Sequence, residues 1–546
     1  MTTLSETSPP RRLRPAAGPG ADPAGGLLDR WGWAALLLVP ATLALFLRPL
    51  IPPVETRYIN VAWEMWSQGK FIVPVLNTEA YSDKPPLFFW MIHAGWALFG
   101  VNEWWPRLIP VLLALLNTSL VGVLATRLWP GVPRLREFSV WMMAGTLAWM
   151  AFGVAMMFDM LLATCVLLGL IGLVQAAATG ARRWHALYAV AIALGILAKG
   201  PVVFLHLLPP ALLAPLWLPG DADRGRWYRR TAVAVLGAIL LAGIWVVPAA
   251  VFGGDAYREK ILWKQTAGRV TDSFAHKRAW WFYILVFPVL ALPWFIWPRA
   301  WSGSRQLLRE GDRGVRFLLC GFVPVFIGFS AISGKQIHYL LPWLPGFVLM
   351  AAAGVAATTR SGGLITLAVP ALVWVALPAA ATVAIALLAG GLSAVALEWA
   401  LGCGSLALVA GVVVAFQRAP PLAGVRRLAT VGSLGLTLML VIFVTGPLAD
   451  RYDVKPAALI IGRFAQAGAP LASTSAYNGE FGFFARLAVP VQDIGPGGVP
   501  GWCAAHPAGL VIDRREPGSP PWPGAVPLYE APFRGRVLHL WGCRPG

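Results

Sequence analysis

The sequence predicts a polytopic α-helical membrane protein with about 13 transmembrane helices and a small C-terminal α/β domain. Of its 546 residues, 58% are hydrophobic and only 13% are charged. An ordinary soluble domain is about 45–50% apolar and about 25% charged. The apolar residues fall in runs of about 17–26, which suits a bilayer core about 30 Å thick. This composition excludes a soluble globular enzyme and a disordered chain.

The N-terminal segment, residues 1–30, is rich in Pro, Gly and Ala and carries four Arg residues, which is typical of a disordered basic cytoplasmic tail. The first apolar run begins only at residue 31, so it predicts an uncleaved signal anchor rather than a signal peptide. The transmembrane domain is expected over residues 31–446. Its spans are predicted at 31–50, 106–127, 137–153, 156–178, 183–198, 201–218, 231–252, 280–298, 316–332, 338–357, 363–389, 393–416 and 428–446.

The run at 87–100 is different, because its 14 residues would reach only about 21 Å as a helix. That is too short to cross a bilayer. It follows two prolines and is rich in Phe and Trp, so we expect it to lie on the membrane surface. A second interfacial helix is expected at 58–66, in the same outer loop, residues 51–105.

The distribution of charge predicts the orientation. The chain has 44 Lys and Arg against 25 Asp and Glu, a net charge of +19. With the N-terminus inside, the loops on the inner side hold 22 of the basic residues, whereas the short outer loops 154–155 and 390–392 hold none. Basic loops mark the cytoplasmic side. The N-terminus is therefore predicted to be cytoplasmic and residues 447–546, the tail domain, periplasmic.

The tail domain has polar stretches, many Gly and Pro, and strand-like runs at 510–512 and 536–540. Residues 455–467 have a helical pattern, so a small α/β domain is expected. Cys503 and Cys543 would lie in an oxidising compartment, where a disulfide can form. The sequence alone does not decide whether these two cysteines pair.

Thirteen basic residues belong neither to the inner loops nor to the tail domain. They lie at the outer ends of spans or in outer loops, where the positive-inside rule does not explain them. A site that binds an anion would explain them. Arg offers a two-pronged fork and Lys a point charge to a phosphate. These residues are Arg48, Arg57, Lys70, Lys84, Arg107, Lys199, Arg258, Lys260, Lys264, Arg269, Lys277, Arg278 and Lys335.

Several of the candidate site residues also have simpler explanations. Long side chains such as Lys84 can extend to the interface, and Lys199 can stabilise the C-terminal end of a helix. Asp159 can cap the following span, and His276 can be a surface histidine. Their joint presence at one membrane face favours a lipid-phosphate site, in which carboxylates could bind a divalent metal or accept a proton.

Motifs across most of the chain resemble the bacterial aminoarabinose transferases of lipid A. These belong with the protein O-mannosyltransferases among the GT-C membrane glycosyltransferases (families 39 and 83). The stretches that carry the resemblance are P-P-V-E-T-R-Y-I-N, Y-S-D-K-P-P-L-F-F-W, L-F-G-V-N-E-W-W-P-R-L, F-D-M, L-A-K-G-P, H-K-R-A-W-W-F-Y and K-Q-I-H-Y-L-L-P-W-L-P.

The resemblance implies a bacterial inner-membrane enzyme that moves a sugar from an undecaprenyl-phosphate donor, with inversion, to lipid A or another envelope glycan. By matching position, Glu55 and Asp159 are the candidate catalytic residues. Asp83 and His276 match residues that can bind a divalent metal such as Zn, Mg or Mn. The residues implied to hold the lipid phosphate are Arg57, Tyr58, Tyr81, Lys84, Lys199, Lys335 and Tyr339.

One position departs from the family pattern, which reads Asp-Glu-x-x-Tyr with the Asp as the favoured catalytic residue. Here Val54 stands at that Asp and Glu55 follows. A hydroxyl acceptor must lose a proton and needs a base, whereas a phosphate monoester is mostly ionised at pH 7. Either Glu55 takes over as base, or a phosphate acceptor makes a base dispensable, or the homologue is inactive.

Three rival functions remain to be weighed. A transporter or lipid flippase would favour inverted repeats and broken helices near mid-membrane, and the sequence shows no convincing repeat. A protein O-glycosyltransferase needs a Ser or Thr acceptor, which makes the missing Asp harder to explain. Nucleic-acid binding is disfavoured, because the tail domain has only nine Lys and Arg and no soluble basic patch. The sugar and the acceptor are not identified by the sequence.

Overall fold

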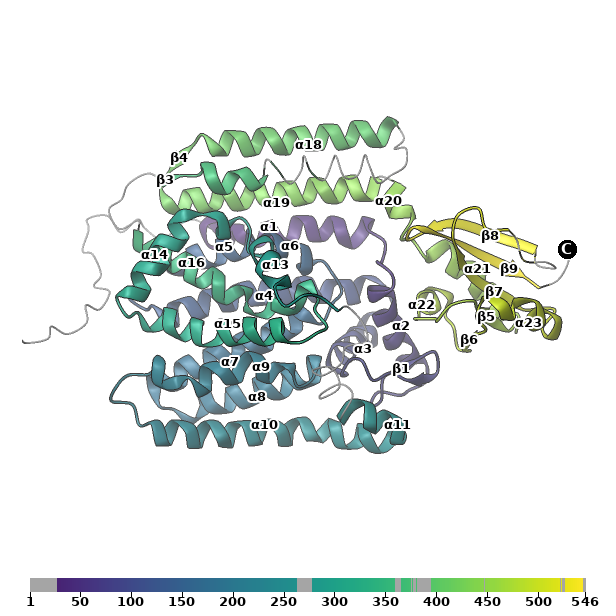
Figure 1. Cartoon of the computed structure of the whole chain (residues 1–546), viewed down its shortest axis with the longest axis horizontal. Coiled ribbons are helices and arrows are strands. Elements are labelled where there is room, and N and C mark those ends of the chain that lie inside the picture. The colour runs from purple at the N-terminus through teal and green to yellow at the C-terminus, as the bar shows by residue number, and fades with distance from the viewer. Residues whose placement is uncertain are drawn as a thin grey trace, which may run out of the picture.

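The computed structural model describes residues 27–262, 277–358, 365–374, 376, 380, 394–445, 447–520, 522 and 526–543. A large body of helices is joined to a smaller domain with a β-sheet at one end (Figure 1). Most of the expected disordered tail at 1–30 lies outside the described residues, but residues 27–30 are helical, as the start of α1 (Leu27–Leu47), so the tail was predicted four residues too long. Most of the expected span at 363–389 also lies outside the described residues.

The outer loop predicted at 51–105 contains two helices, as the sequence indicates. After α1 (Leu27–Leu47) come α2 (Val54–Ser67) and α3 (Leu87–Phe99), with the short antiparallel strands β1 (Val75–Leu76) and β2 (Glu79–Ala80) between them. Nine of the 14 residues of α2 are buried. This helix is therefore packed inside the protein, where it contacts α3 and the tail domain, rather than resting only on a membrane surface.

The body of the protein is a bundle of apolar helices. α7 lies near its centre, since almost nine-tenths of its apolar stretch is buried. Only 22% of the apolar stretch of α10 is buried, so α10 forms an outer wall. Besides α1, which packs against α4 and α19, the bundle contains α4 (Trp104–Leu128), α5 (Leu135–Ala144), α6 (Leu147–Gly153), α7 (Asp159–Thr179), α8 (Arg182–Lys199), α9 (Val202–Leu212), η1 (Ala214–Leu216), α10 (Arg224–Phe252), α11 (Gly254–Glu259), α13 (Phe282–Leu290), η3 (Trp294–Ile296), α14 (Pro298–Arg309), α15 (Arg313–Ala331), η4 (Ile337–Trp343), α16 (Leu344–Thr358), β3 (Ile365–Thr366), α18 (Ala394–Ala415), β4 (Arg418–Ala419), α19 (Pro421–Thr445) and α20 (Pro447–Asp450).

Within the described residues, six helical segments are long and apolar enough to cross a membrane. They are Trp104–Leu128, Asp159–Thr179, Arg224–Phe252, Arg313–Ala331, Ile337–Thr358 and Pro421–Val444. Several of the other predicted spans are present as shorter or interrupted helices.

The predicted span at 137–153 is wrong as a single helix, because it is divided into α5 and α6. The break falls at Gly145, where a Cβ atom would lie 2.5 Å from the Cβ atom of Ala429 on α19. That close approach explains why a glycine is needed there. The span at 280–298 is likewise divided, into α13 and η3.

The tail domain contains a five-stranded mixed sheet in the order β6-β5-β7-β9-β8. β5 is parallel to β6 and β7, and β9 is antiparallel to β7 and β8. The elements are α21 (Lys455–Gln466), β5 (Leu471–Ser473), α22 (Gly482–Ala485), β6 (Val491–Asp493), η5 (Pro496–Gly498), α23 (Val499–Ala505), β7 (Leu510–Arg515), β8 (Val526–Phe533) and β9 (Arg536–Gly542). A disulfide joins Cys503 on α23 to Cys543.

The segment that holds many of the candidate site residues lies between the helical bundle and the tail domain. Figure 1 shows α2 and β1 at the end of the bundle that faces the sheet, next to α22. The loop between β2 and α3 continues this segment. The arrangement brings residues from the N-terminal fifth of the chain next to residues from its last hundred.

Candidate functional site

Three bundle elements bring a buried charged cluster together. Asp159 is the first residue of α7, Lys199 the last of α8, and His338 lies at the start of η4. Nζ of Lys199 is 2.6 Å from Oδ1 of Asp159, and Nε2 of His338 is 3.9 Å from Oδ2 of the same carboxylate. Only 3% of the Asp159 side chain is exposed. The N-terminus of α7 also favours a negative charge at this position.

An aromatic ring completes this cluster. Nζ of Lys199 lies 5.2 Å from the centre of the Tyr339 ring, at a distance that favours a cation–π contact. The His338 and Tyr339 rings have an edge-to-face contact with centroids 5.2 Å apart. Lys199 is therefore held between a carboxylate and an aromatic face.

A cavity of about 580 Å³, which includes the open solvent at its mouth, lies beside Lys199. Lys84 and Asp83, from the loop before α3, also line it. The remaining lining is Ser82, Pro85, Ile196, Gly200, Pro201, Trp245, Val246, Tyr257 and Ile261. Two cations beside a largely apolar wall suit an anion that is attached to a hydrocarbon chain.

Tyr58 and Tyr81 are both buried. Burial raises the pKa of Tyr58, and the neighbouring Tyr81 and Asp159 raise it further. Its hydroxyl therefore stays protonated at neutral pH and can donate a hydrogen bond to an anion. The ring of Tyr58 packs edge-to-face on Phe158, the residue before Asp159.

Glu55 is already occupied by four hydrogen-bond donors. Nη1 and Nη2 of Arg48 lie 2.7 and 2.9 Å from its two oxygens, and the backbone N–H groups of Ile51 and Met156 donate at 2.7 and 2.8 Å. Burial opposes ionisation of Glu55, but Arg48 and these N–H groups outweigh it and lower the pKa of the carboxyl. Such a carboxylate is a poor proton acceptor.

Arg57 and Lys335, two of the candidate phosphate ligands, have partners within the protein. Nη2 of Arg57 donates to Oδ1 of Asn478 in the tail domain, at 3.0 Å. Nζ of Lys335 donates to the carbonyl oxygens of Arg278, at 3.1 Å, and of Ile332. The Lys335 side chain is buried and joins the segment before α13 to the loop before η4.

The metal site stays a prediction. Asp83 is exposed at the cavity, and His276 lies outside the described residues. Among the described residues, no group of three or more His, Cys, Asp or Glu side chains is placed to hold a metal ion. A hard cation such as Mg²⁺ needs only one or two carboxylates when phosphate oxygens and water complete its coordination shell, so Asp83 fits that role.

Sequence reasoning missed three residues that the structure places beside the candidates. His338 contacts Asp159, Arg48 pairs with Glu55, and Asn478 binds Arg57. Arg48 was visible as a cation that topology does not explain, and His338 stands in the K-Q-I-H-Y motif. Nothing in the sequence pattern connects Asn478 with Arg57.

A known protein family matches the part of the chain that carries several of these residues. Residues 83–252 match the family described as dolichyl-phosphate-mannose-protein mannosyltransferase. This stretch contains Lys84, Asp159 and Lys199.

Relatives match over a longer stretch. The undecaprenyl phosphate-alpha-4-amino-4-deoxy-L-arabinose arabinosyl transferase 2 of Pseudomonas fluorescens Pf-5 is 31% identical over 379 residues, 64% of this chain and 61% of that protein. The transferase of this type from Pseudomonas aeruginosa PAO1 is 30% identical over 332 residues, 58% of this chain and 57% of that protein. The chain thus spans less than two thirds of the length of these relatives.

The fold agrees over nearly the whole chain. The crystal structure of ArnT from Cupriavidus metallidurans in the apo state covers 94% of this chain and 98% of its own, with a TM-score of 0.73 at 19% identity. The same protein bound to undecaprenyl phosphate gives a TM-score of 0.72. The chain is therefore a polytopic α-helical membrane protein. Its predicted resemblance to the aminoarabinose transferases, of the GT-C type, is confirmed in sequence and in fold.

Proposed function

We propose that the protein is a membrane glycosyltransferase that moves a sugar from an undecaprenyl-phosphate donor to lipid A or another envelope glycan. The observation that carries this proposal is the cavity in which Lys84 and Lys199 lie beside an apolar wall. The relatives named arabinosyl transferases support a sugar on undecaprenyl phosphate. The arabinosyl transferases match more of the chain than the mannosyltransferase family does. This favours lipid A or another envelope glycan as the acceptor over the hydroxyl of a protein.

The proposed reaction is direct transfer with inversion. The acceptor oxygen forms a bond to the anomeric carbon, the bond from that carbon to the lipid phosphate breaks, and its electron pair leaves with the phosphate. Lys84 and Lys199 stabilise the negative charge that develops on the leaving phosphate. Tyr58, whose hydroxyl stays protonated, would donate a further hydrogen bond to that phosphate.

The acceptor's proton, where it still has one, goes to the pair formed by Asp159 and His338. Glu55 is engaged by Arg48 and two backbone N–H groups, so the proposed mechanism gives it a supporting role. When a donor phosphate binds, it competes with Asp159 for Lys199, which frees the carboxylate for the acceptor side.

Mass spectrometry of lipid A and other glycolipids, from cells with and without this protein, tests the proposed function. We expect a pentose or hexose on lipid A, or on another envelope glycan, only in cells that contain the protein. The purified full chain should also consume an undecaprenyl-phosphate sugar when lipid A is added. Unchanged glycolipids together with no donor consumption would reject the proposal.

We also propose 13 membrane passes with a cytoplasmic N-terminus and a periplasmic tail domain. The concentration of basic residues in alternate loops supports this orientation. The disulfide between Cys503 and Cys543 is typical of an oxidising compartment. A reporter fused after residue 543 that is active only in the cytoplasm should stay silent, and a strong signal from it would contradict this topology.

We further propose that Asp83 and His276 hold a divalent ion against the donor phosphate. When bound, the ion would supply additional positive charge to the leaving phosphate. Chelation should lower donor turnover, and Asp83→Asn should raise the Mg²⁺ or Mn²⁺ concentration that restores half of the activity. Full activity after exhaustive chelation would contradict a metal requirement. Wild-type donor affinity in the Asp83→Asn variant at every metal concentration would exclude Asp83 as a ligand.

A further inference from the structure

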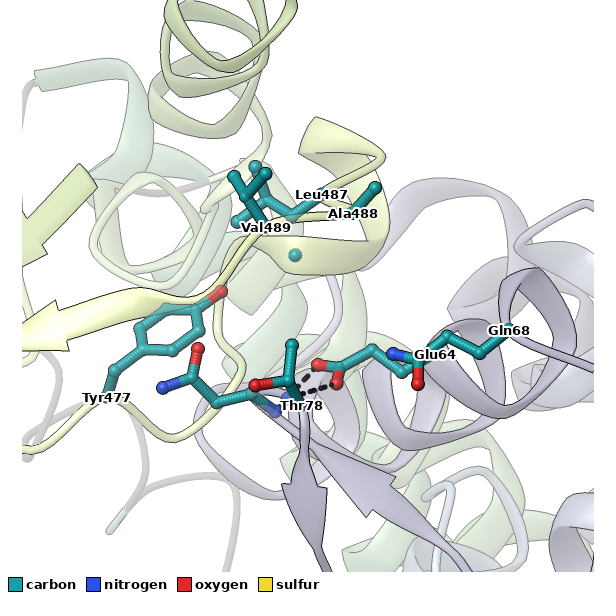
Figure 2. A pocket seen from close by; sticks show the side chains of 9 residues that line it. Glu64, Gln68, Thr78, Tyr477, Leu487, Ala488 and Val489 are labelled. Atoms are coloured by element: carbon teal, nitrogen blue, oxygen red, sulfur yellow. Dashed lines mark hydrogen bonds between the residues drawn. The ribbon is translucent and has the colours of Figure 1, made fainter. Parts of the chain in front are cut away.

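The tail domain docks on α2 and on the turn between β1 and β2, whose side chains reach backbone groups of the tail domain. Nε1 of Trp63 donates to the carbonyl of Leu487 at 3.1 Å. Asn77 donates to the carbonyl of Val491 at 2.9 Å and accepts from the N–H of Val491 at 2.8 Å. A small cavity remains at this seam, and Figure 2 shows Tyr477 of the tail domain lining it together with Glu64 and Thr78.

One loop of the tail domain approaches α2 more closely than ordinary side chains would allow. A Cβ atom on Gly479 would lie 2.7 Å from Nδ2 of Asn60, and one on Gly482 would lie 2.2 Å from Oδ1 of the same side chain. Gly479 also has a φ of +78°, which favours glycine. These two positions keep the loop that carries Asn478 tight against α2.

Asn478 is oriented by its own domain. Its Nδ2 donates to the carbonyl of Ala476 at 3.0 Å, and its backbone N–H donates to Oε2 of Glu480 at 2.9 Å. Glu480 is buried and is held in turn by Nη1 of Arg514 on β7, at 3.0 Å. This chain of contacts leaves the side-chain oxygen of Asn478 directed at Arg57.

The hydrogen bond to Asn478 limits the movement of the Arg57 guanidinium. Its Nε atom is buried and has no hydrogen-bond partner within the described residues, whereas Nη2 donates to Asn478. The guanidinium is planar, so a hydrogen bond at one terminal nitrogen restricts the directions in which its other N–H groups can point. A neutral amide accepts this hydrogen bond without cancelling the positive charge.

We propose that Asn478 is a positioning residue that holds Arg57 in place for the donor phosphate, so that the tail domain forms part of the donor site. The inference rests on the proposed function and adds a polar contact from the far end of the chain. The neutrality of Asn478 is essential to it, because a carboxylate at this position would compete with the phosphate for Arg57.

The test measures binding of undecaprenyl phosphate, and the KM for its sugar-loaded form, on the full chain in micelles. Asn478→Ala should weaken both about tenfold, the size expected when a charged group loses one well-placed hydrogen bond. The kcat should stay within about twofold, because the reacting atoms are untouched. Asn478→Asp should weaken binding more than Asn478→Ala, although an aspartate would strengthen docking of the two parts.

Two controls separate positioning from docking. Trp63→Phe removes one hydrogen bond across the seam but keeps an aromatic ring there, and it should leave donor affinity unchanged. In an Arg57→Ala background the effect of Asn478→Ala should disappear, because the two residues act together. The inference is overturned if Asn478→Asp binds the donor as well as the wild type, or if Trp63→Phe weakens binding as much as Asn478→Ala.

The outcome also distinguishes this inference from the proposed function. If the wild-type protein neither binds undecaprenyl phosphate nor consumes its sugar-loaded form, the proposed function fails. If the wild type does both and the Asn478 variants match it, only the positioning role fails.

Discussion

Sugar transfer should fall at least about a hundredfold when Lys84 is replaced by Ala, and should be lost when Arg57 is replaced as well. One preorganised group that stabilises developing charge contributes about 10²–10³ in rate. Lys84 lines the cavity from a loop, so its removal leaves the helical bundle intact. The measurement is the initial rate of donor consumption by purified variants whose thermal unfolding matches that of the wild type.

Two further variants make this result specific. Lys70→Ala changes the same charge in the same outer segment, on an exposed side chain outside the cavity, and should keep the wild-type rate. Lys84→Arg preserves the charge and should keep part of the activity. A near-normal rate in the Lys84→Ala, Arg57→Ala double variant would remove both residues from the site. Lys199 is less suitable for this test, because its loss would leave buried Asp159 without its 2.6 Å partner.

Arg48→Met should destabilise the protein by about 3–5 kcal/mol, the usual cost of leaving one partner of a buried ion pair behind. The Arg48 and Glu55 side chains are only 10% and 5% exposed. Glu55 would keep two backbone N–H donors but lose both donors of the guanidinium. The measurement is unfolding of the purified chain in micelles, by heat or denaturant.

The control and the companion variant ask whether Glu55 supports the fold or performs chemistry. Arg258→Met breaks an exposed pair with Asp255 and should cost less than about 1 kcal/mol. Glu55→Gln should lower stability but keep the rate of sugar transfer per folded molecule within a few-fold. A loss of several hundredfold in that rate, at unchanged fold, would assign the base role to Glu55 instead.

The positions of most helices along the sequence could be predicted, because hydropathy is a local property of the chain. Long apolar runs such as 106–127 and 156–178 correspond to α4 and α7 with shifts of only a few residues. The break between α5 and α6 could not be predicted in this way, because residues 137–153 form one continuous apolar run. The break falls at Gly145, which lies close against Ala429, a residue far away in the sequence, and hydropathy does not report such contacts.

The sequence could predict which residues belong to the candidate site, but not which charged side chains pair with one another. Clustered motifs indicate that Asp159, Lys199 and Tyr339 lie together, and the structure places them in contact. Whether a carboxylate is available or already neutralised depends on its neighbours in space. Glu55 and Asp159 are both carboxylates in the sequence. In the structure, four hydrogen-bond donors surround Glu55, whereas Lys199 and His338 flank Asp159.

The ion pair between Asp159 and Lys199 bears on which anions the cavity can retain. The cavity is lined by Lys84, Lys199 and Asp83, and Lys199 is paired with Asp159. Together these four side chains carry no net formal charge. Small soluble anions gain little from such a site, because they must displace a carboxylate and bring no hydrocarbon to bury. In the proposed function, a polyprenyl chain packed against Trp245 and Val246 would supply that missing free energy. Inorganic phosphate at millimolar concentration should therefore compete poorly with the lipid donor, which would protect the enzyme from inhibition by common metabolites.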